Sequence, residues 1–371
     1  MKNVCLISYS HSNNYGASLQ LFATYKYLEK IGCKVKILNY KNRFEAASEG
    51  LDFLFQRASI KLKLKWFISG CLFGSIKNGK DNFRLFYESM QYTPPVQTAE
   101  ELSMLTDFDI FCVGSDQVWN ANITNGYDEI FCLNNNQIDR KISFSSSMGS
   151  LNGRQFDSSI LFNSLKSFES IAVREHIAKQ YIESNINKDV KVTVDPTLLF
   201  TYNEWNELLK LEQIENLIRE KYVLIYALGG AFENNNVIAR KIANIIGAKT
   251  AVITLSNRPK KVDYLLNHVT PAQFVKLISN AAFVVTNSFH GTCFAFIYNI
   301  PFYSVRYGAN PARAEELLIK YGLSERIYKD DTVIKNEILD NIDLKAAREK
   351  LKDKKEDSEM WLKKAVYGSN I

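Results

Sequence analysis

The stretch AFVVTNSFHGTCFAFIY, residues 282–298, joins a short apolar run directly to an apolar helical pattern through one polar turn. A buried strand of about four to eight residues, followed by a turn and a helix, makes one βα unit. The same alternation recurs along most of the chain. We therefore expect an α/β fold built on parallel sheets with helices packed against them.

The length of 371 residues exceeds one ordinary core and suggests two domains. In the first half, apolar runs predict a helix over residues 17–31 and strands over 4–9, 34–38, 109–113, 141–145, 171–173 and 190–194. After a charged stretch over 203–221, expected to be helical, the pattern restarts with strands over 222–227, 249–255, 282–286 and 301–305. We predict two Rossmann-like lobes, residues 1–200 and 201–340, with a helix over 344–365 packed on the first. Such a pair resembles the glycosyltransferase-B arrangement, in which substrates meet in a cleft between the lobes.

The composition is that of a globular protein. Hydrophobic residues make up 46% of the chain and charged residues 23%, which excludes a disordered protein. The net charge of +6 is modest, and lysines and arginines alternate with acids, so no nucleic-acid partner is expected. The six cysteines form no CxxC pair, and no apolar run reaches about 18 residues. We expect the first residues to form a buried strand rather than a signal peptide. We expect a reduced, cytoplasmic protein.

One basic segment stands apart from this even distribution. Residues 57–80 hold six lysines and arginines and no acid, interspersed with aromatic side chains. Such a segment could contact an anionic membrane surface, which would place the protein peripherally at the inner face of the cell membrane. The alternative is a helical pair that packs its apolar side on the first lobe and leaves the lysines solvated.

The most informative loop follows the strand over 282–286. Ligands of parallel sheets bind beyond the carboxyl ends of the strands, and His290 lies there, close to a helix start. Free amides and the helix dipole favour a bound anion at that position. The alternative is a histidine that only caps the helix. The residues expected to hold phosphate or carboxylate oxygens are Asn287, Ser288, Gly291 and Thr292.

A second polar loop, VGSDQVWN over residues 113–120, follows a strand of the first lobe. Its polar side chains could bond sugar hydroxyls, while Trp119 could offer an apolar face to a sugar ring. The alternative is a capped turn with a tryptophan in the core. The expected acceptor contacts here are Asp116, Gln117, Trp119 and Asn120.

Five further residues, in three places, are candidates. Asn14 and Gly16 lie between the first strand and first helix, where no GxGxxG fingerprint is present but a polar substrate could bind. Gly229 and Gly230 occupy the equivalent place in the second lobe and could hold phosphate, or simply form a turn. Arg174 could pair with a carboxylate or phosphate, or with Glu175 at the surface.

Read together, several segments resemble the polysaccharide pyruvyl transferase family over residues 1–317. They are NNYGASLQ, GSDQVWN, the SSSMG turn over 145–149, VREH over 173–176, VDPTLL over 194–199, and TNSFHGTCFA followed by IPF. The resemblance implies a glycosyltransferase-B-like fold, phosphoenolpyruvate as donor, and as acceptor a cell-surface glycan or its lipid-linked precursor. It also implies that His290 matches the family's catalytic histidine.

The turn departs from the family at one position. Family members that pyruvylate carry Arg-Leu-His at this turn, and their arginine binds the donor. This chain has Ser288-Phe289-His290 instead. The basic residues near the neighbouring strand ends that could replace that arginine are Arg258, Arg306 and Arg313.

The chemistry implied is formation of a ketal between pyruvate and a sugar diol. We expect His290 to be the general acid and Asp116 to orient or deprotonate the acceptor hydroxyl. No cofactor is expected. No metal is expected either, because the four histidines are far apart and show no HxH or HExxH spacing.

Two other functions remain open. The two-lobe fold alone fits a glycosyltransferase that uses a nucleotide sugar, since such folds do not distinguish donors. A non-catalytic glycan-binding relative is the third hypothesis, suggested by Ser288 in place of arginine.

Overall fold

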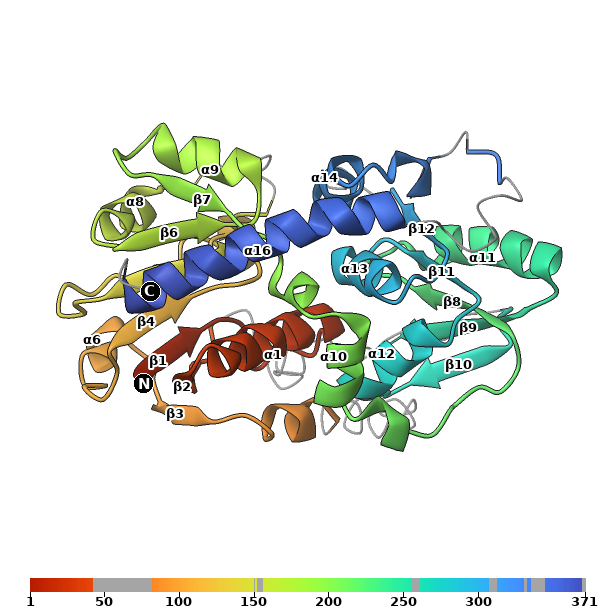
Figure 1. Cartoon of the computed structure of the whole chain (residues 1–371), viewed down its shortest axis with the longest axis horizontal. Helices are drawn as coiled ribbons and strands as arrows, with labels where there is room; N and C mark the ends of the chain where they lie inside the picture. Colours follow the sequence, from red (N-terminus) through yellow and green to blue (C-terminus); the bar gives the residue numbers. More distant parts are fainter. Residues whose placement is uncertain are drawn as a thin grey trace, which may run out of the picture. The chain divides into compact units, whose positions relative to one another are not determined.

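The computed structural model describes residues 1–42, 82–149, 151, 156–254, 261–306, 312–329, 332–334 and 344–368. The chain divides into two compact units (Figure 1). Of the described residues, the first unit holds 1–42, 84–199 and 354–368, and the second holds 82–83 and 200–353 with the gaps above. The membrane contact predicted for 57–80 falls outside the described residues.

The first unit is built on a seven-stranded sheet in the order β3-β2-β1-β4-β5-β6-β7, and all neighbouring strands are parallel. Its strands are β1 (Lys2–Ile7), β2 (Cys33–Asn39), β3 (Tyr92–Pro95), β4 (Ile110–Val113), β5 (Lys141–Ser146), β6 (Ser170–Val173) and β7 (Val190–Val192). Its helices are α1 (Tyr15–Lys30), α6 (Ala99–Leu102), α7 (Ala121–Thr124), α8 (Ser159–Leu165), α9 (His176–Glu183) and the 3₁₀ turn η1 (Pro196–Leu199).

The second unit repeats this order in a six-stranded sheet, β10-β9-β8-β11-β12-β13, again parallel throughout. Its strands are β8 (Tyr222–Tyr226), β9 (Lys249–Thr254), β10 (Tyr264–Asn267), β11 (Phe283–Thr286), β12 (Phe302–Val305) and β13 (Ile327–Tyr328). Its helices are α10 (Tyr202–Leu208), α11 (Phe232–Ile246), α12 (Pro271–Ser279), α13 (Phe289–Ile297) and α14 (Ala312–Lys320), with 3₁₀ turns η2 (Leu211–Gln213) and η3 (Ser324–Arg326).

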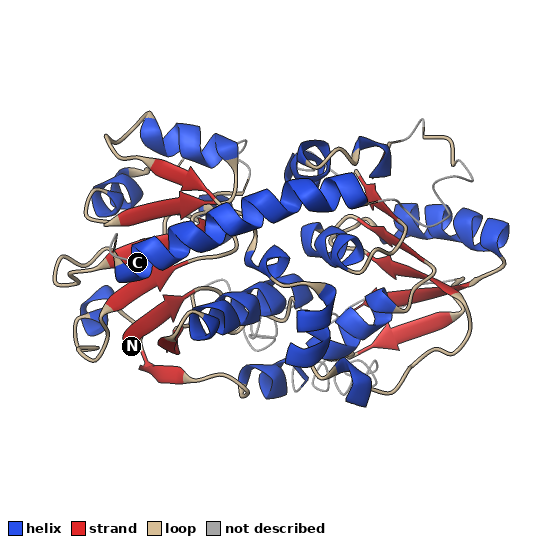
Figure 2. Cartoon of the chain, viewed as in Figure 1, coloured by secondary structure: helices blue, strands red, loops and turns tan. Residues whose placement is uncertain are grey.

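The central strands form because their residues suit burial on both faces. β4, β8 and β11 are apolar or β-branched throughout and fully buried, as strands of a parallel sheet covered on both sides should be. The strands of each unit run side by side with helices alongside them (Figure 2). Two Rossmann-like sheets confirm the predicted α/β fold class.

One predicted helix was too long, and three strands, β3, β10 and β13, were not predicted. The helix expected over 203–221 ends at Leu208, because Lys210 adopts a left-handed conformation that an α-helix does not continue through. The strand β3 was missed because it contains Pro94 and Pro95, which lower strand propensity but are tolerated at the sheet edge where β3 lies.

The C-terminal helix α16 (Lys345–Tyr367) contributes its last turns to the first unit. Trp361 stacks on Phe144 of β5 with ring centroids 6.3 Å apart. Arg140 donates to the carbonyl of Ala365, and the Tyr367 hydroxyl donates to the carbonyl of Ile31 at 2.8 Å. Within the described chain, no helix is both long and apolar enough to span a bilayer.

Candidate functional site

Each sheet has one point at which the strand order reverses direction. In the first unit it lies between β1 and β4, and in the second between β8 and β11. Loops that leave the carboxyl ends of two such strands diverge to opposite faces and open a crevice, where ligands of doubly wound sheets bind. The predicted site loops follow these four strands, so each lobe gathers its own set at its own switch point.

In the second unit, side chains lock the loop after β11 to the loop after β8. The Thr286 hydroxyl donates to the carbonyl of Tyr226 at 2.7 Å and accepts the amide of Ser288 at 3.0 Å. The Asn287 amide group donates to the Leu228 carbonyl at 3.0 Å and accepts the Leu228 amide at 2.7 Å. Asn287 therefore fixes the backbone immediately before the exposed Gly229 and Gly230.

The residues that begin α13 build the turn with their own side chains. Ser288 is the N-cap and its hydroxyl accepts the amide of Gly291 at 3.3 Å. The buried Thr292 donates its hydroxyl to the Ser288 carbonyl at 3.0 Å. A Cβ on Gly291 would lie 2.6 Å from the Thr286 hydroxyl oxygen, so packing alone requires glycine there. The anion contacts expected of these residues stay predictions.

His290 is the second residue of α13 and is 6% exposed. Its ring meets the Phe289 ring edge-on, with centroids 5.1 Å apart. The guanidinium carbon of Arg313, on α14, lies 5.8 Å from the centre of the same Phe289 ring. Arg306 instead pairs with Glu315 at 2.8 Å. Arg258 falls outside the described residues.

In the first unit, the loop after β4 turns sharply against β5. The Gly114–Ser115 peptide is cis, and Gly114 and Asp116 both have positive φ. A Cβ on Gly114 would lie 2.2 Å from the carbonyl oxygen of Phe144, so only glycine fits. The Asp116 carbonyl accepts the amide of Ser147 at 2.8 Å. Asp116 is thereby held at the carboxyl end of the sheet, where it is 9% exposed.

A buried group of charges lies at the ends of β5, β6 and β7. Arg174 donates from Nη1 to Asp195 at 2.6 Å and from Nε to Glu175 at 3.1 Å. The Ser147 hydroxyl donates to the same Glu175 oxygen at 2.6 Å. Burial alone would lower the pKa of Arg174, but attraction to Glu175, Asp195 and Asp116 outweighs burial and raises that pKa.

This arrangement corrects one expectation. Glu175 is 4% exposed and is therefore not the surface partner that the sequence suggested. Arg174 is buried and bonded to two carboxylates, and its expected contact with the anionic donor stays a prediction. Asp116 is close enough to contribute to the raised pKa of Arg174.

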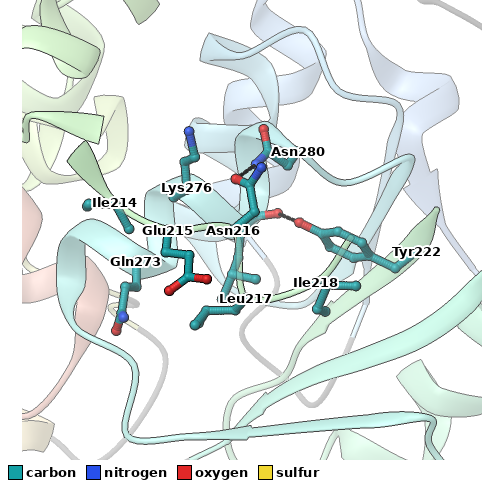
Figure 3. A pocket seen from close by; sticks show the side chains of 10 residues that line it. Ile214, Glu215, Asn216, Leu217, Ile218, Tyr222, Gln273, Lys276 and Asn280 are labelled. Atoms are coloured by element: carbon teal, nitrogen blue, oxygen red, sulfur yellow. Dashed lines mark hydrogen bonds between the residues drawn. The ribbon is translucent and has the colours of Figure 1, made fainter. Parts of the chain in front are cut away.

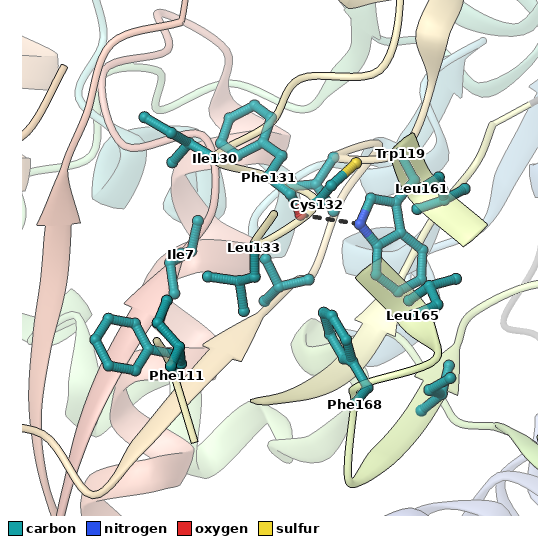
Figure 4. Close-up of a cluster of buried hydrophobic side chains, with 14 of the residues drawn as sticks. Ile7, Phe111, Trp119, Ile130, Phe131, Cys132, Leu133, Leu161, Leu165 and Phe168 are labelled. Carbon is teal, nitrogen blue, oxygen red and sulfur yellow. Dashed lines mark hydrogen bonds between the residues drawn. The ribbon is translucent and has the colours of Figure 1, made fainter. Parts of the chain in front are cut away.

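Trp119 and its neighbours also differ from the prediction. Trp119 is 1% exposed and its indole nitrogen donates to the carbonyl of Phe131 at 3.0 Å, inside the hydrophobic core of the first unit (Figure 4). A ring buried in this way has no face for a sugar, so its expected acceptor role is wrong. Asn120 caps α7 and donates to the Gln117 side chain at 2.7 Å, which commits both amides to the turn.

The loop after β1 also stabilises the fold, because one of its side chains caps a helix. Asn14 caps α1 and accepts the amide of Gly16 at 2.8 Å, and Gly16 is buried. The loop nevertheless adjoins the loop after β4, since the Tyr9 hydroxyl donates to the Gln117 carbonyl at 3.2 Å.

The first unit holds a polar cavity of about 490 Å³ beyond the carboxyl ends of its strands. It is lined by Tyr40, Asn42, Gln97, Thr98, Ala99, Glu100, Thr124, Asn125, Gly126, Tyr127, Asp128, Glu129 and Ile130. A pocket of about 10 Å³ in the second unit lies by Tyr222, the first residue of β8 (Figure 3). His290 instead follows the carboxyl end of β11, so this pocket lies at the other end of the strands. Among described residues, no three His, Cys, Asp or Glu side chains are grouped to bind a metal ion.

The chain is similar to known proteins in structure, and its sequence matches a known family. The UDP-GlcNAc 2-epimerase of Methanocaldococcus jannaschii is similar in structure, with TM-score 0.53 and 14% identity over 94% of this chain and 92% of that chain. The Neisseria meningitidis UDP-GlcNAc 2-epimerase bound to UDP-GlcNAc gives TM-score 0.51 and 14% identity, covering 98% and 94%. Such identities show the fold alone, which is glycosyltransferase-B-like. No curated protein sequence matches. Residues 14–309 match the family model described as polysaccharide pyruvyl transferase, and the chain therefore belongs to the polysaccharide pyruvyl transferase family.

Proposed function

We propose that this protein transfers the pyruvyl group of phosphoenolpyruvate to a sugar diol of a cell-surface polysaccharide or its lipid-linked precursor. The observation that carries the proposal is His290 on the first turn of α13, at the switch point of the second sheet, in a chain that matches the pyruvyl transferase family. The donor binds in the second unit and the acceptor in the first.

The second switch point suits an anionic donor. The dipole of α13, a nine-residue helix, favours negative charge at its start, where His290 lies. The exposed Gly229 and Gly230 leave the backbone open to a close-lying phosphate. Ser288 and Asn287 hold the two loops in place by the bonds described above, rather than by reaching for the ligand themselves.

The first switch point suits a polyhydroxylated acceptor. Asp116 lies beside a group of buried carboxylates that repel anions and accept hydrogen bonds. The polar cavity of the same unit contains Glu100, Asp128 and Glu129, and its volume is of the size that holds a sugar unit.

The reaction follows from these assignments. His290 gives a proton to the methylene carbon of phosphoenolpyruvate, and the cationic carbon that results is attacked by the first acceptor hydroxyl, whose proton passes to Asp116. The second hydroxyl then adds to the same carbon as inorganic phosphate leaves with its bonding electrons and that hydroxyl's proton. The products are a cyclic ketal and phosphate.

Thermal stabilisation tests the donor. Phosphoenolpyruvate should raise the melting temperature of the purified protein in a concentration-dependent way, because a ligand that binds only the folded state stabilises it. A panel of nucleotide sugars serves as comparison. Stabilisation by a nucleotide sugar and none by phosphoenolpyruvate would overturn the proposal in favour of glycosyl transfer.

Asp116→Asn tests the acceptor side separately. This variant should bind phosphoenolpyruvate as the unchanged protein does, yet release phosphate at least about 100-fold more slowly with an acceptor, the lower range for loss of a general base. Unchanged acceptor kinetics would remove Asp116 from the mechanism.

A further inference from the structure

The polar cavity of the first unit lies apart from the carboxylate that is proposed to take the proton of the reacting hydroxyl. Its described lining comes mainly from the segments that follow β2, β3 and α7, and Asp116 is not part of it. Asp116 follows β4, and β1 separates β4 from β2. Neighbouring strands are spaced by roughly 5 Å, so the carboxyl ends of β2 and β4 are roughly 10 Å apart.

Two aromatic side chains connect the cavity wall to the loop that carries Asp116. Tyr40 lines the cavity and meets the Phe131 ring edge-on, with ring centroids 5.6 Å apart. Phe131 meets Tyr9 edge-on at 5.0 Å, and the Tyr9 hydroxyl donates to the Gln117 carbonyl at 3.2 Å. The contact path from the cavity to the loop thus passes through two rings. A single sugar ring is too small to occupy the cavity and to reach Asp116 at the same time.

The walls of the cavity carry the groups that a saccharide needs. Tyr127 is half-buried, so part of its ring is accessible from the cavity that it lines. The exposed amide side chains of Gln97 and Asn125 can both donate to and accept from sugar hydroxyls. An accessible aromatic face beside such amides suits a polyhydroxylated ring.

The charges of the described lining are all negative. Glu100 and Glu129 are exposed at the wall, while Asp128 stabilises the wall by accepting the Tyr40 hydroxyl at 2.7 Å. Bonds from its own amide and from the Thr98 hydroxyl lower the pKa of Glu100, which is therefore ionised at neutral pH. Among the described lining residues none is lysine, arginine or histidine. A carboxylate or phosphate group on a bound sugar would therefore be repelled.

We propose that this cavity binds a second, uncharged sugar unit of the acceptor, next to the unit whose diol reacts at Asp116. The inference rests on the proposed function for the place of the reacting diol, whereas the preference for an uncharged saccharide follows from the lining of the cavity itself. The acceptor is then at least a disaccharide, and the unit that the cavity holds carries no acidic group.

Calorimetric titration with disaccharides, in the absence of phosphoenolpyruvate, tests the cavity. The probes are cellobiose, lactose and diacetylchitobiose, which are neutral, and digalacturonic acid, which is anionic. At low salt we expect saturable binding of at least one neutral disaccharide and at least several-fold weaker binding of digalacturonic acid, because salt screens the repulsion by the exposed acids. No binding of any neutral probe, or tighter binding of the anionic one, would overturn the proposal.

Two residues of the wall locate the bound sugar. Tyr127→Ala should weaken binding of the neutral disaccharide about 2- to 10-fold, the range for a lost aromatic contact, and Tyr127→Phe should keep it because the ring remains. Glu129→Lys should bring the affinities of the neutral and the anionic disaccharide several-fold closer at low salt, since it replaces repulsion with attraction.

Asp107→Lys is the matched control. It makes the same change of charge on an exposed residue of the first unit, but before the amino end of β4, so the ratio of the two affinities should stay within about twofold. Equal melting temperatures without sugar will show that each variant is folded. If Tyr127→Ala and Glu129→Lys both bind the sugars as the unchanged protein does, the saccharide lies outside the cavity and the proposal is wrong.

Failure of the proposed function has a different signature from failure of this inference. If phosphoenolpyruvate does not bind, while a neutral disaccharide binds in a way that depends on Tyr127 and Glu129, the donor is wrong and the saccharide site stands. If phosphate is released with the same kcat/KM for a monosaccharide as for the disaccharide that contains it, the transfer stands and the second sugar site is refuted.

Discussion

The two switch points share one strand order but differ in their chemistry. In the first unit, Asp116, Glu175 and Asp195 surround Arg174 in a nearly dry setting. In the second, the turn is held by neutral hydroxyl and amide groups, and its described charges are brought by α14 rather than by the turn. The same topology therefore carries buried acids at one switch point and a turn held by neutral groups at the other.

Under the proposed function, this difference separates the two substrates. A neutral sugar diol is recognised by acceptors of its hydroxyl protons, whereas an anion needs N–H donors and positive potential. The chain belongs to the polysaccharide pyruvyl transferase family.

The largest expected effect is on turnover. His290→Gln should reduce the rate of phosphate release about 100- to 10,000-fold, because glutamine keeps the size of the side chain but cannot transfer a proton. Calorimetry should show that phosphoenolpyruvate still binds. Turnover equal to that of the unchanged protein would exclude His290 as the acid.

The next effect is on stability and compares an arginine from each unit. Arg174→Met removes the cation from the buried acids and should lower the free energy of unfolding by about 3–5 kcal/mol, because the carboxylates lose their partner in a low-dielectric site. Arg306→Met breaks an ion pair whose arginine is 53% exposed, and it should change the free energy of unfolding by less than about 1 kcal/mol. Urea unfolding followed by tryptophan fluorescence measures both. Equal losses would mean that the buried charges of the first unit are not coupled as described.

A smaller effect is expected at the second turn. Gly291→Ala should destabilise by about 1–3 kcal/mol, since the added methyl group would collide with the Thr286 side chain. Removing that side chain as well, in Gly291→Ala with Thr286→Ala, should cost less than the sum of the two single changes. Additive losses in this double-mutant cycle would show that the two residues do not compete for the same space.

The smallest effect should come from chelation. In the proposed chemistry the proton is supplied by His290 and no step uses a metal ion, so treatment with EDTA should leave phosphate release unchanged. Activity lost with EDTA and restored by one divalent cation would show that the donor is bound through a metal instead.

Much of the fold could be predicted because its central strands carry their own signal. The runs that form β4, β8 and β11 consist of aliphatic, aromatic and β-branched residues with one cysteine, and parallel sheets covered on both faces favour such runs. The short edge strands β3 and β13 carry no such signal, since an edge strand is set by its neighbour more than by its own sequence.

The sequence indicated which loops form the candidate site, but not which contacts their side chains make. A polar residue after a strand can bind a ligand or satisfy the backbone of its own turn, and both uses look alike in sequence. Asn14, Asn120 and Ser288 proved to cap helices, and Trp119 lies in the core. The pair of Arg174 with Glu175 was considered only as a surface contact, and the second buried partner, Asp195, was not predicted.

The central claim is that the second unit binds an anionic donor at the turn that carries His290. A calorimetric titration of the unchanged protein with phosphoenolpyruvate, run beside Asp116→Asn, tests it most directly. We predict one phosphoenolpyruvate per chain, bound equally by the unchanged protein and by Asp116→Asn. The absence of binding, or binding that Asp116→Asn abolishes, would contradict the account.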